Sequence, residues 1–282
     1  LRRPRFWYLN PFESRSSQNV IYKGNPGLTP TFTNSFDLGY LQKIGKLTLN
    51  SSIYFQHSIN SILRVSRDEI RLLDGVNQVI TIREPINLAS EDRFGFELTA
   101  NYNPSKKVRL SGSFNVFQQE SKGLYAYNKF IIDEITGAIS ATPETQDLGN
   151  TNNSWFTRFN ATFSLPWKIQ MQNRLSYRGP RNTAQSESEG IFSANIALSK
   201  DVFKEKGSLV LNVSDVFNSR KIKSTNYNPS IENPTSISYQ ESQWRVRQVS
   251  LNFTYRFNQK KKQQRDRRGG EDFEGGEDFG TP

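Results

Sequence analysis

The sequence has no cysteine and a single histidine, and it has no long run of apolar residues. The absence of cysteine excludes disulfide bonds, thiolate metal sites and catalysis by a cysteine nucleophile. No segment approaches the roughly 18 consecutive apolar residues that a membrane-spanning helix needs. Only 34% of the 282 residues are hydrophobic, and this length is enough for one large domain or two small ones.

A secretory leader is also missing from the start of the chain. Such a leader combines a basic stretch, an apolar stretch and small residues at its cleavage site. This chain begins instead with Leu-Arg-Arg-Pro-Arg-Phe-Trp-Tyr. We therefore expect the sequence to be a mature fragment or a truncated part of a longer protein.

The clearest positive signal is the alternation of residue types in residues 155–165. Apolar side chains such as Phe159 alternate there with polar ones such as Asn160, and the pattern resumes in residues 169–177. Because strand side chains point to opposite faces with period two, each segment presents one apolar and one polar surface. Soluble strands are usually about five or six residues long, whereas a tilted strand needs about nine to eleven to cross a bilayer. The two segments therefore predict a hairpin of a transmembrane β-barrel, whose strands also carry aromatic residues near both ends.

The same period recurs along most of the chain, which predicts an all-β, antiparallel fold. Low hydropathy is compatible with a barrel, because a wet lumen requires apolar residues only at every second strand position. With the two strands above, the pattern predicts nine strands. The seven further segments are residues 31–41, 47–56, 93–102, 108–116, 192–198, 208–214 and 243–257.

The connections between these strands alternate in length. Short turns near residues 42–46, 103–106, 165–168 and 200–207 alternate with long polar connections near residues 63–90, 119–150, 179–188 and 218–240. Short periplasmic turns and long external loops are typical of outer-membrane barrels. The rule predicts that the first and last strands both run toward the periplasm.

Nine is an odd number of strands, whereas single-chain bacterial barrels have even numbers. We therefore expect residues 1–9 to be the outer end of a preceding strand and residues 10–30 to form an external loop.

A second region follows the predicted barrel of residues 1–257. Residues 260–268 are densely basic, and two copies of Gly-Gly-Glu-Asp-Phe follow them. Such a composition cannot bury a core, so we expect residues 258–282 to be a disordered, charged periplasmic tail. The alternative is a docking peptide with Phe273 and Phe279 as anchors.

Three strings resemble a known family. They are the Leu-Asn-Pro-Phe of residues 9–12 with residues 22–30 and 35–40, then Asn-Val-Ser-Asp-Val-Phe-Asn-Ser-Arg at residues 212–220, and Tyr-Arg-Phe at residues 255–257. Together they are similar to the C-terminal barrel of TonB-dependent outer-membrane receptors, in the branch called the outer membrane protein β-barrel family. The resemblance spans most of the chain.

That resemblance implies a barrel of about 22 strands, of which this chain supplies the C-terminal nine or ten. It also implies an N-terminal plug domain, the TonB energising complex and outer-membrane lipid as partners, with a surface lipoprotein as a further candidate. The function it implies is energised uptake of a nutrient. The alternative is a structural or adhesive barrel without transport.

The net charge of +10 raises the question of nucleic-acid binding. Basic residues are spread along the chain, and the one dense basic run is followed at once by acidic residues. We therefore expect no nucleic-acid partner, since a basic surface equally suits the anionic lipid of an outer leaflet.

Candidate ligand-binding side chains lie on the predicted inward face of the opening hairpin. One interpretation is that they solvate and cross-link a polar lumen, as any barrel of this kind requires. The other is that they bind an anionic ligand or contact a plug. These residues are Arg158, Gln170, Gln172, Arg174 and Arg178.

Catalytic chemistry has little support in the sequence. His57 lies on an outward-facing position, and Ser58 beside it points to the opposite face, so the pair does not form a nucleophile and base. Carboxylates are scattered in the long connections without the regular spacing of a metal site. We expect neither an enzyme nor a cofactor. The carboxylates considered are Asp68, Glu69, Asp74, Asp133 and Glu134.

Aromatic residues divide into two groups. Tyr40, Tyr102, Trp155 and Tyr177 lie near strand ends, where interfacial girdles occur. Aromatic side chains in the long connections could instead stack on a sugar or on a chelate ligand, and these are Tyr125, Tyr127 and Phe130.

Overall fold

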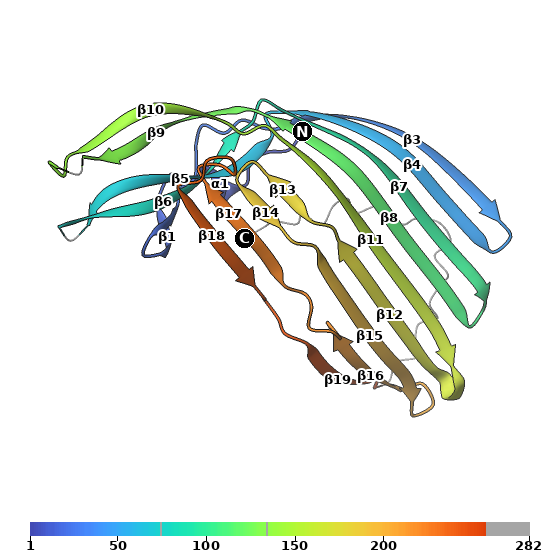
Figure 1. The fold of residues 1–282 in the computed structure, drawn as a ribbon. Helices are drawn as coiled ribbons and strands as arrows, with labels where there is room; N and C mark the ends of the chain where they lie inside the picture. Colours follow the sequence, from blue (N-terminus) through green and yellow to red (C-terminus); the bar gives the residue numbers. More distant parts are fainter. Residues whose placement is uncertain (74, 134, 258–282) are drawn as a thin grey trace.

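The computed structural model describes residues 1–73, 75–133 and 135–257. Within these residues, nine strands form one curved antiparallel sheet, which confirms the expected fold class (Figure 1). Each strand pairs with the sheet strands nearest to it in sequence. From one edge to the other, the strands are β3 (Phe32–Ile44), β4 (Leu47–Ile59), β7 (Ser90–Ser105), β8 (Val108–Lys122), β11 (Asn150–Leu165), β12 (Ile169–Arg178), β15 (Ile191–Val202), β16 (Gly207–Ser214) and β19 (Gln248–Tyr255).

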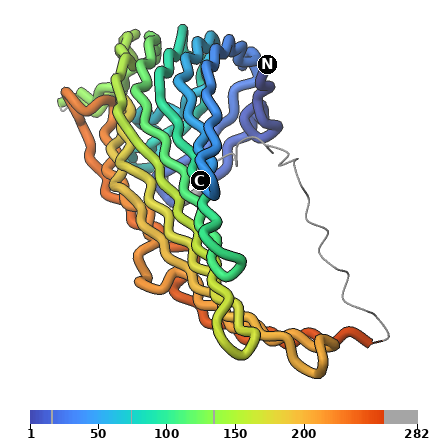
Figure 2. The backbone as a smooth tube through the Cα atoms, turned by 90° about the vertical axis from the view of Figure 1, so that its right-hand side faces the viewer, coloured from blue at the N-terminus to red at the C-terminus, as the bar shows by residue number. Residues whose placement is uncertain are grey.

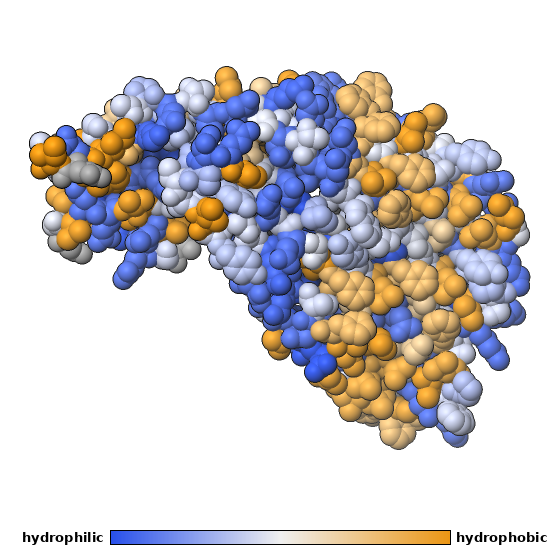
Figure 3. Space-filling model, in the orientation of Figure 1, coloured by the Kyte–Doolittle hydropathy of each residue, from blue (hydrophilic) through white to orange (hydrophobic). Residues whose placement is uncertain are grey.

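The register of the sheet keeps residue types on separate faces. In the β11–β12 pair, Phe159 lies opposite Leu175 and Asn160 lies opposite Arg174. Directly opposed residues share a face, so one face of the sheet is apolar and the other is polar. Apolar side chains on the first face are exposed, with Phe36 at 67% and Leu251 at 65%. Figure 3 shows apolar side chains gathered over the sheet. The alternation predicted from sequence is therefore confirmed.

A close contact on the polar face fixes the packing of β4 against β7. Tyr54 lies opposite Gly95, and its hydroxyl is 3.3 Å from the side-chain oxygen of Asn115. A Cβ atom at Gly95 would lie 2.5 Å from the Tyr54 ring. Because glycine has no side chain, the Tyr54 ring can pack directly against the backbone at Gly95. Tyr54 is buried there.

The two ends of the sheet differ. At one end, short turns join β3 to β4, β7 to β8, β11 to β12 and β15 to β16, and the third of these holds the 3-10 turn η1 (Pro166–Lys168). At the other end, the connecting segments form a hairpin layer. This layer consists of β1 (Ser14–Ser17), β2 (Val20–Tyr22), β5 (Ile62–Leu73), β6 (Val76–Asn87), β9 (Leu124–Ile132), β10 (Ile139–Asp147), β13 (Arg181–Thr183), β14 (Ser186–Ser188), β17 (Ile222–Asn228) and β18 (Ser236–Ser242).

The start of the chain differs from the sequence expectation. Residues 1–9 do not form the outer end of a strand, because Phe6–Leu9 is the short helix α1 and Arg2 makes an isolated bridge to Thr31. Residues 10–30 contain β1 and β2, which join β6 and β5 in a four-stranded sheet. β1 pairs with β2, and β2 pairs with β6, which gives both strands backbone partners that a free loop would lack.

Two clusters of buried apolar side chains lie in the hairpin layer. Ile21, Ile80 and Ile82 form one cluster between β2 and β6. A second cluster joins two connecting segments, residues 60–89 and 123–149, and consists of Val65, Leu88, Tyr125 and Leu148. The long connections are thus packed structures, because they bury apolar side chains against one another.

The sheet is open within the described residues, with β3 and β19 as its edges (Figures 1 and 2). None of the helices in this part of the chain is long and apolar enough to span a membrane. The predicted tail of residues 258–282 lies outside the described residues.

Candidate functional site

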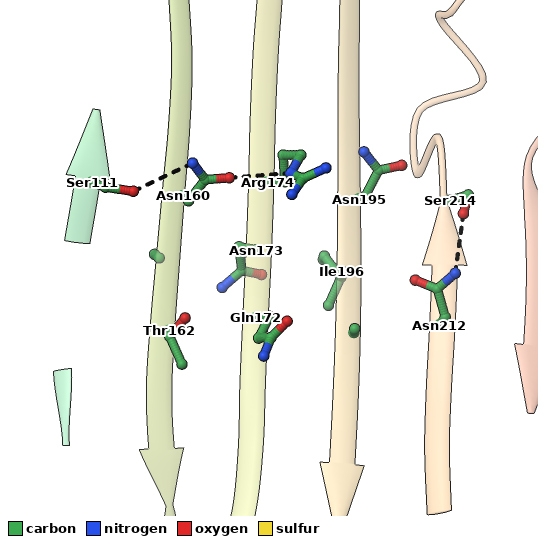
Figure 4. A pocket seen from close by; sticks show the side chains of 12 residues that line it. Ser111, Asn160, Thr162, Gln172, Asn173, Arg174, Asn195, Ile196, Asn212 and Ser214 are labelled. Carbon is green, nitrogen blue, oxygen red and sulfur yellow. Dashed lines mark hydrogen bonds between the residues drawn. The ribbon is translucent and has the colours of Figure 1, made fainter. Parts of the chain in front are cut away.

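A cavity of about 540 Å³ lies on the polar face at the centre of the sheet (Figure 4). Five neighbouring strands, β8, β11, β12, β15 and β16, contribute to it. Cross-strand pairing places Asn160 beside Arg174, and Arg174 beside Asn195. The polar residues that line it are Ser111, Asn160, Thr162, Gln172, Asn173, Arg174, Asn195, Asn212 and Ser214.

Hydrogen bonds order the middle of this row. The Asn160 amide donates to the Ser111 hydroxyl at 3.3 Å, and Arg174 Nε donates to Asn160 Oδ1 at 3.2 Å. Asn195 Oδ1 accepts the backbone N–H of Asp215 at 3.0 Å. The row offers neutral donors and acceptors with one guanidinium, which suits a wet surface or a polar solute.

The five predicted site residues share the polar face, as their register requires. Gln172 and Arg174 line the cavity. Arg158 lies instead over the Phe156 ring, with its guanidinium carbon 5.4 Å from the ring centroid. Gln170 and Arg178 lie toward the two ends of β12 and are not among the residues that line the cavity. The structure therefore brings two of the five together.

Gln185 joins separate parts of the hairpin layer. It accepts the backbone N–H of Ser66 at 2.8 Å and donates to the Ser66 carbonyl at 2.9 Å. Its amide also donates to the Pro229 carbonyl at 2.6 Å. The Gln185 side chain thus satisfies both backbone groups of Ser66 on β5. It also fixes three segments that are distant in sequence, around Ser66, Gln185 and Pro229, to one another. Nothing in the polar string around Gln185 marks this role in sequence.

Arg71 connects β5 to the start of β1. Its guanidinium donates to both Glu13 oxygens at 2.8 Å and to Glu69 at 2.6 Å. The bonds from Arg71 lower the pKa of Glu13. Burial alone would raise the pKa of Glu69, but hydrogen bonds from Arg71 and Arg67 outweigh it and lower that pKa. Both carboxylates are therefore held in the charged form.

A buried tyrosine lies between β6 and β9. Tyr125 donates its hydroxyl to Glu84 at 2.5 Å, and Arg67 donates to the same carboxylate oxygen at 3.3 Å. Burial, together with the bond to Glu84, raises the pKa of Tyr125. Its ring stacks on Tyr127, with the two centroids 5.4 Å apart. These contacts fix the orientation of both rings.

His57 has a carboxylate partner that sequence reasoning missed. Its Nδ1 lies 2.5 Å from Asp92 Oδ1, on the apolar-face side of β4 and β7. Ser58 points to the other face, as predicted, where its hydroxyl is 2.9 Å from that of Thr33. A nucleophile is therefore not presented to His57 by its neighbour Ser58.

The acidic residues expected in loops are divided between a strand and a turn. Asp68 and Glu69 lie on β5, and Asp133 caps the turn that follows β9 by accepting two backbone N–H groups. Asp74 and Glu134 lie outside the described residues. In the described part of the chain, no group of three or more His, Asp or Glu side chains could hold a metal ion.

Comparison with known protein families gives a match over nearly the whole chain. The sequence pattern of the outer membrane protein beta-barrel family matches residues 1–255. The chain belongs to this family. Searches of curated proteins and of solved structures found no match.

Membership in this outer-membrane barrel family explains the two faces of the sheet. The apolar face is the one that meets lipid, and the polar face is the lumenal one. The predicted girdle residues Tyr40, Tyr102, Trp155 and Tyr177 all lie on the lipid-facing side, and the rings of the last two are 4.5 Å apart. The location in the outer membrane follows from the family.

Proposed function

We propose that this barrel belongs to a receptor that binds a nutrient outside the cell and imports it with energy from the TonB complex. The observation that carries the proposal is the hairpin layer. Its segments come from separate connections, pack around shared cores and are fixed by Gln185 at one end of a polar lumen. An ordered layer of this kind can hold a binding site, which free loops would assemble only at an entropic cost.

The proposal places the hairpin layer outside the cell and the short turns in the periplasm. Its partners are outer-membrane lipid, a plug domain in the lumen, the TonB complex and a surface lipoprotein over the hairpins. It involves no nucleic acid and no catalysis. Ser58 points away from His57, which supports a role without catalysis.

Uptake by intact cells tests this proposal. A strain with the gene and a strain lacking it are grown in defined medium, and solute depletion is followed by mass spectrometry with and without a protonophore. We expect at least one solute to be depleted only by the first strain, and only without the protonophore. Equal depletion under all conditions would contradict energised import. A plug domain encoded upstream in the gene would support it independently.

An adhesive barrel is the second candidate. Apolar side chains at hairpin tips favour it, since Leu72, Val76 and Ile135 are exposed by 66%, 61% and 97%. Such side chains are common in surfaces that meet a protein partner. Loss of cell attachment with unchanged uptake in the deletion strain would favour this function over import.

A further inference from the structure

A second cavity, of about 400 Å³, lies inside the hairpin layer, away from the lumenal row. Residues of three hairpins, β5–β6, β9–β10 and β17–β18, line it. Figure 1 shows the positions of these hairpins. Residues from all three are thus needed to complete it. The lining residues that matter here are Asp68, Ile70, Val79, Tyr127, Phe130 and Asn228.

The apolar part of the cavity has a fixed aromatic side chain. Tyr127 stacks nearly parallel on Tyr125, with an interplanar angle of 11°. Tyr125 is itself held by its bond to Glu84. With Ile70 and Phe130, the Tyr127 ring gives an apolar wall whose orientation is set before a ligand arrives. Little entropy is then lost when a ligand stacks on it.

Asn228 supplies an unused polar group in this wall. The residue is only 6% exposed, and neither its side-chain oxygen nor its side-chain nitrogen has a hydrogen-bond partner among the described residues. Its backbone carbonyl is occupied by Thr235, whose N–H donates at 2.7 Å and whose hydroxyl donates at 2.9 Å. A buried primary amide without partners costs free energy, so it calls for a ligand group or a water that both donates and accepts.

The hairpin that carries Asn228 is held from two sides. Gln146 and Gln185 both donate to the carbonyl of Pro229, the next residue, at 2.5 and 2.6 Å. Asn228 is therefore positioned by β10 and by the β13–β14 turn as well as by its own hairpin.

The charges around the cavity discriminate between ligand classes. Lys129 lines it but is paired with Glu144 at 3.4 Å. Asp68 accepts the Thr81 hydroxyl at 2.8 Å and retains further acceptor positions. A carboxylate and a neutralised lysine do not favour an anion. The polar groups that remain for a ligand beside the aromatic ring are the Asp68 oxygens and the Asn228 amide.

We propose that this cavity binds a neutral sugar residue of an oligosaccharide. The apolar C–H face of the sugar stacks on Tyr127, while its hydroxyl groups donate to Asp68 and exchange hydrogen bonds with the Asn228 amide. A sugar hydroxyl both donates and accepts, which is what the unused amide requires. This inference rests on the proposed function for its biological meaning, since it names the class of nutrient.

Binding to the purified full-length protein in detergent tests the inference. The probes are maltohexaose, cellohexaose, mannohexaose and xylohexaose, with citrate as the anionic comparison, and binding is measured by calorimetry. We expect saturable binding of at least one oligosaccharide and none of citrate. Tyr127→Ala and Asn228→Ala should each weaken binding roughly tenfold, the loss of one stacking or polar contact.

Two matched variants control for folding. Tyr127→Phe keeps the ring and should bind like the wild type. Leu124→Ala changes an exposed residue of the same strand outside the cavity and should also leave affinity unchanged.

Three outcomes would overturn the inference: no oligosaccharide binds at millimolar concentration, citrate binds instead, or the Tyr127 and Asn228 variants bind as tightly as Leu124→Ala. Because the measurement uses purified protein without an energy source, its failure is separate from a failure of energised import. Sugar binding with no protonophore-sensitive depletion would refute import and leave this site in place.

Discussion

A single residue pair, Tyr54 and Gly95, determines how β4 packs against β7 on the lumenal face of the sheet. The ring occupies the space that a side chain at Gly95 would need. Gly95→Ala should therefore force the ring or the backbone to move and destabilise the folded barrel by about 1–3 kcal/mol. Unfolding titrations in lipid vesicles measure the change.

Gly112→Ala is the matched control for this prediction. The nearest atoms to a Cβ at Gly112 are 3.9 Å away, which is ordinary contact. We expect its unfolding midpoint to stay close to that of the wild type. An equal shift in both variants would mean that the Tyr54 contact is not the cause.

Individual side-chain roles were only partly predictable from the sequence. The sequence correctly places Arg174 and Gln172 on the polar face, because side chains of a strand alternate between its two faces. The pairing of His57 with Asp92 depends on the register between β4 and β7, which no local pattern gives. The joining of Ser66 to Pro229 by Gln185 depends on contacts across as many as 119 residues.

At the scale of the strand, the two faces of β11 should respond differently to charge. Phe159 lies on the apolar face and Asn160 on the polar face. Phe159→Arg should cost about 2–4 kcal/mol if its Cα lies near the bilayer midplane, whereas Asn160→Arg should cost little. Folding titrations into vesicles measure both values, and equal costs would contradict the assignment of the two faces.

The contact between β1 and β5 should depend on pH. Both Glu13 and Glu69 have a lowered pKa, so their ion pairs with Arg71 stabilise the fold above the usual carboxylate range. That contribution disappears as the pH falls through the lowered pKa values. We expect hydrogen exchange in residues 14–17 to accelerate in acid relative to β11. Arg71→Gln should give the fast exchange already at neutral pH.

The nine sheet strands were predictable because each has a lipid face and a wet face, which imposes the period of two. The hairpin layer was not, since its strands bury side chains against one another. In β5, Val65 belongs to a core cluster while Arg67 on the same face pairs with Glu84, so the face is not uniformly apolar. The sequence pattern of these segments is therefore that of polar connections. The second cavity follows from their packing and could not be read from any one of them.

For the whole molecule, the absence of cysteine allows a direct test of orientation. Ile135→Cys places a thiol at an exposed hairpin tip, and Trp167→Cys places one in the short turn between β11 and β12. On intact cells, a membrane-impermeant maleimide should label the first and not the second. Permeabilised cells should label both, and the reverse pattern on intact cells would invert the proposed orientation.

Gln185 also bears on the order in which the molecule forms. Strands of the sheet pair with sequence neighbours, so their ladders can form one after another as the chain is supplied. The Gln185 bonds reach back to Ser66 and forward to Pro229, and such non-local contacts form late because loop closure precedes them. The sugar cavity, which needs Asn228 beside Tyr127, would then be completed only after most of the sheet exists. The protein would therefore become able to bind the sugar only after the barrel has inserted into the membrane.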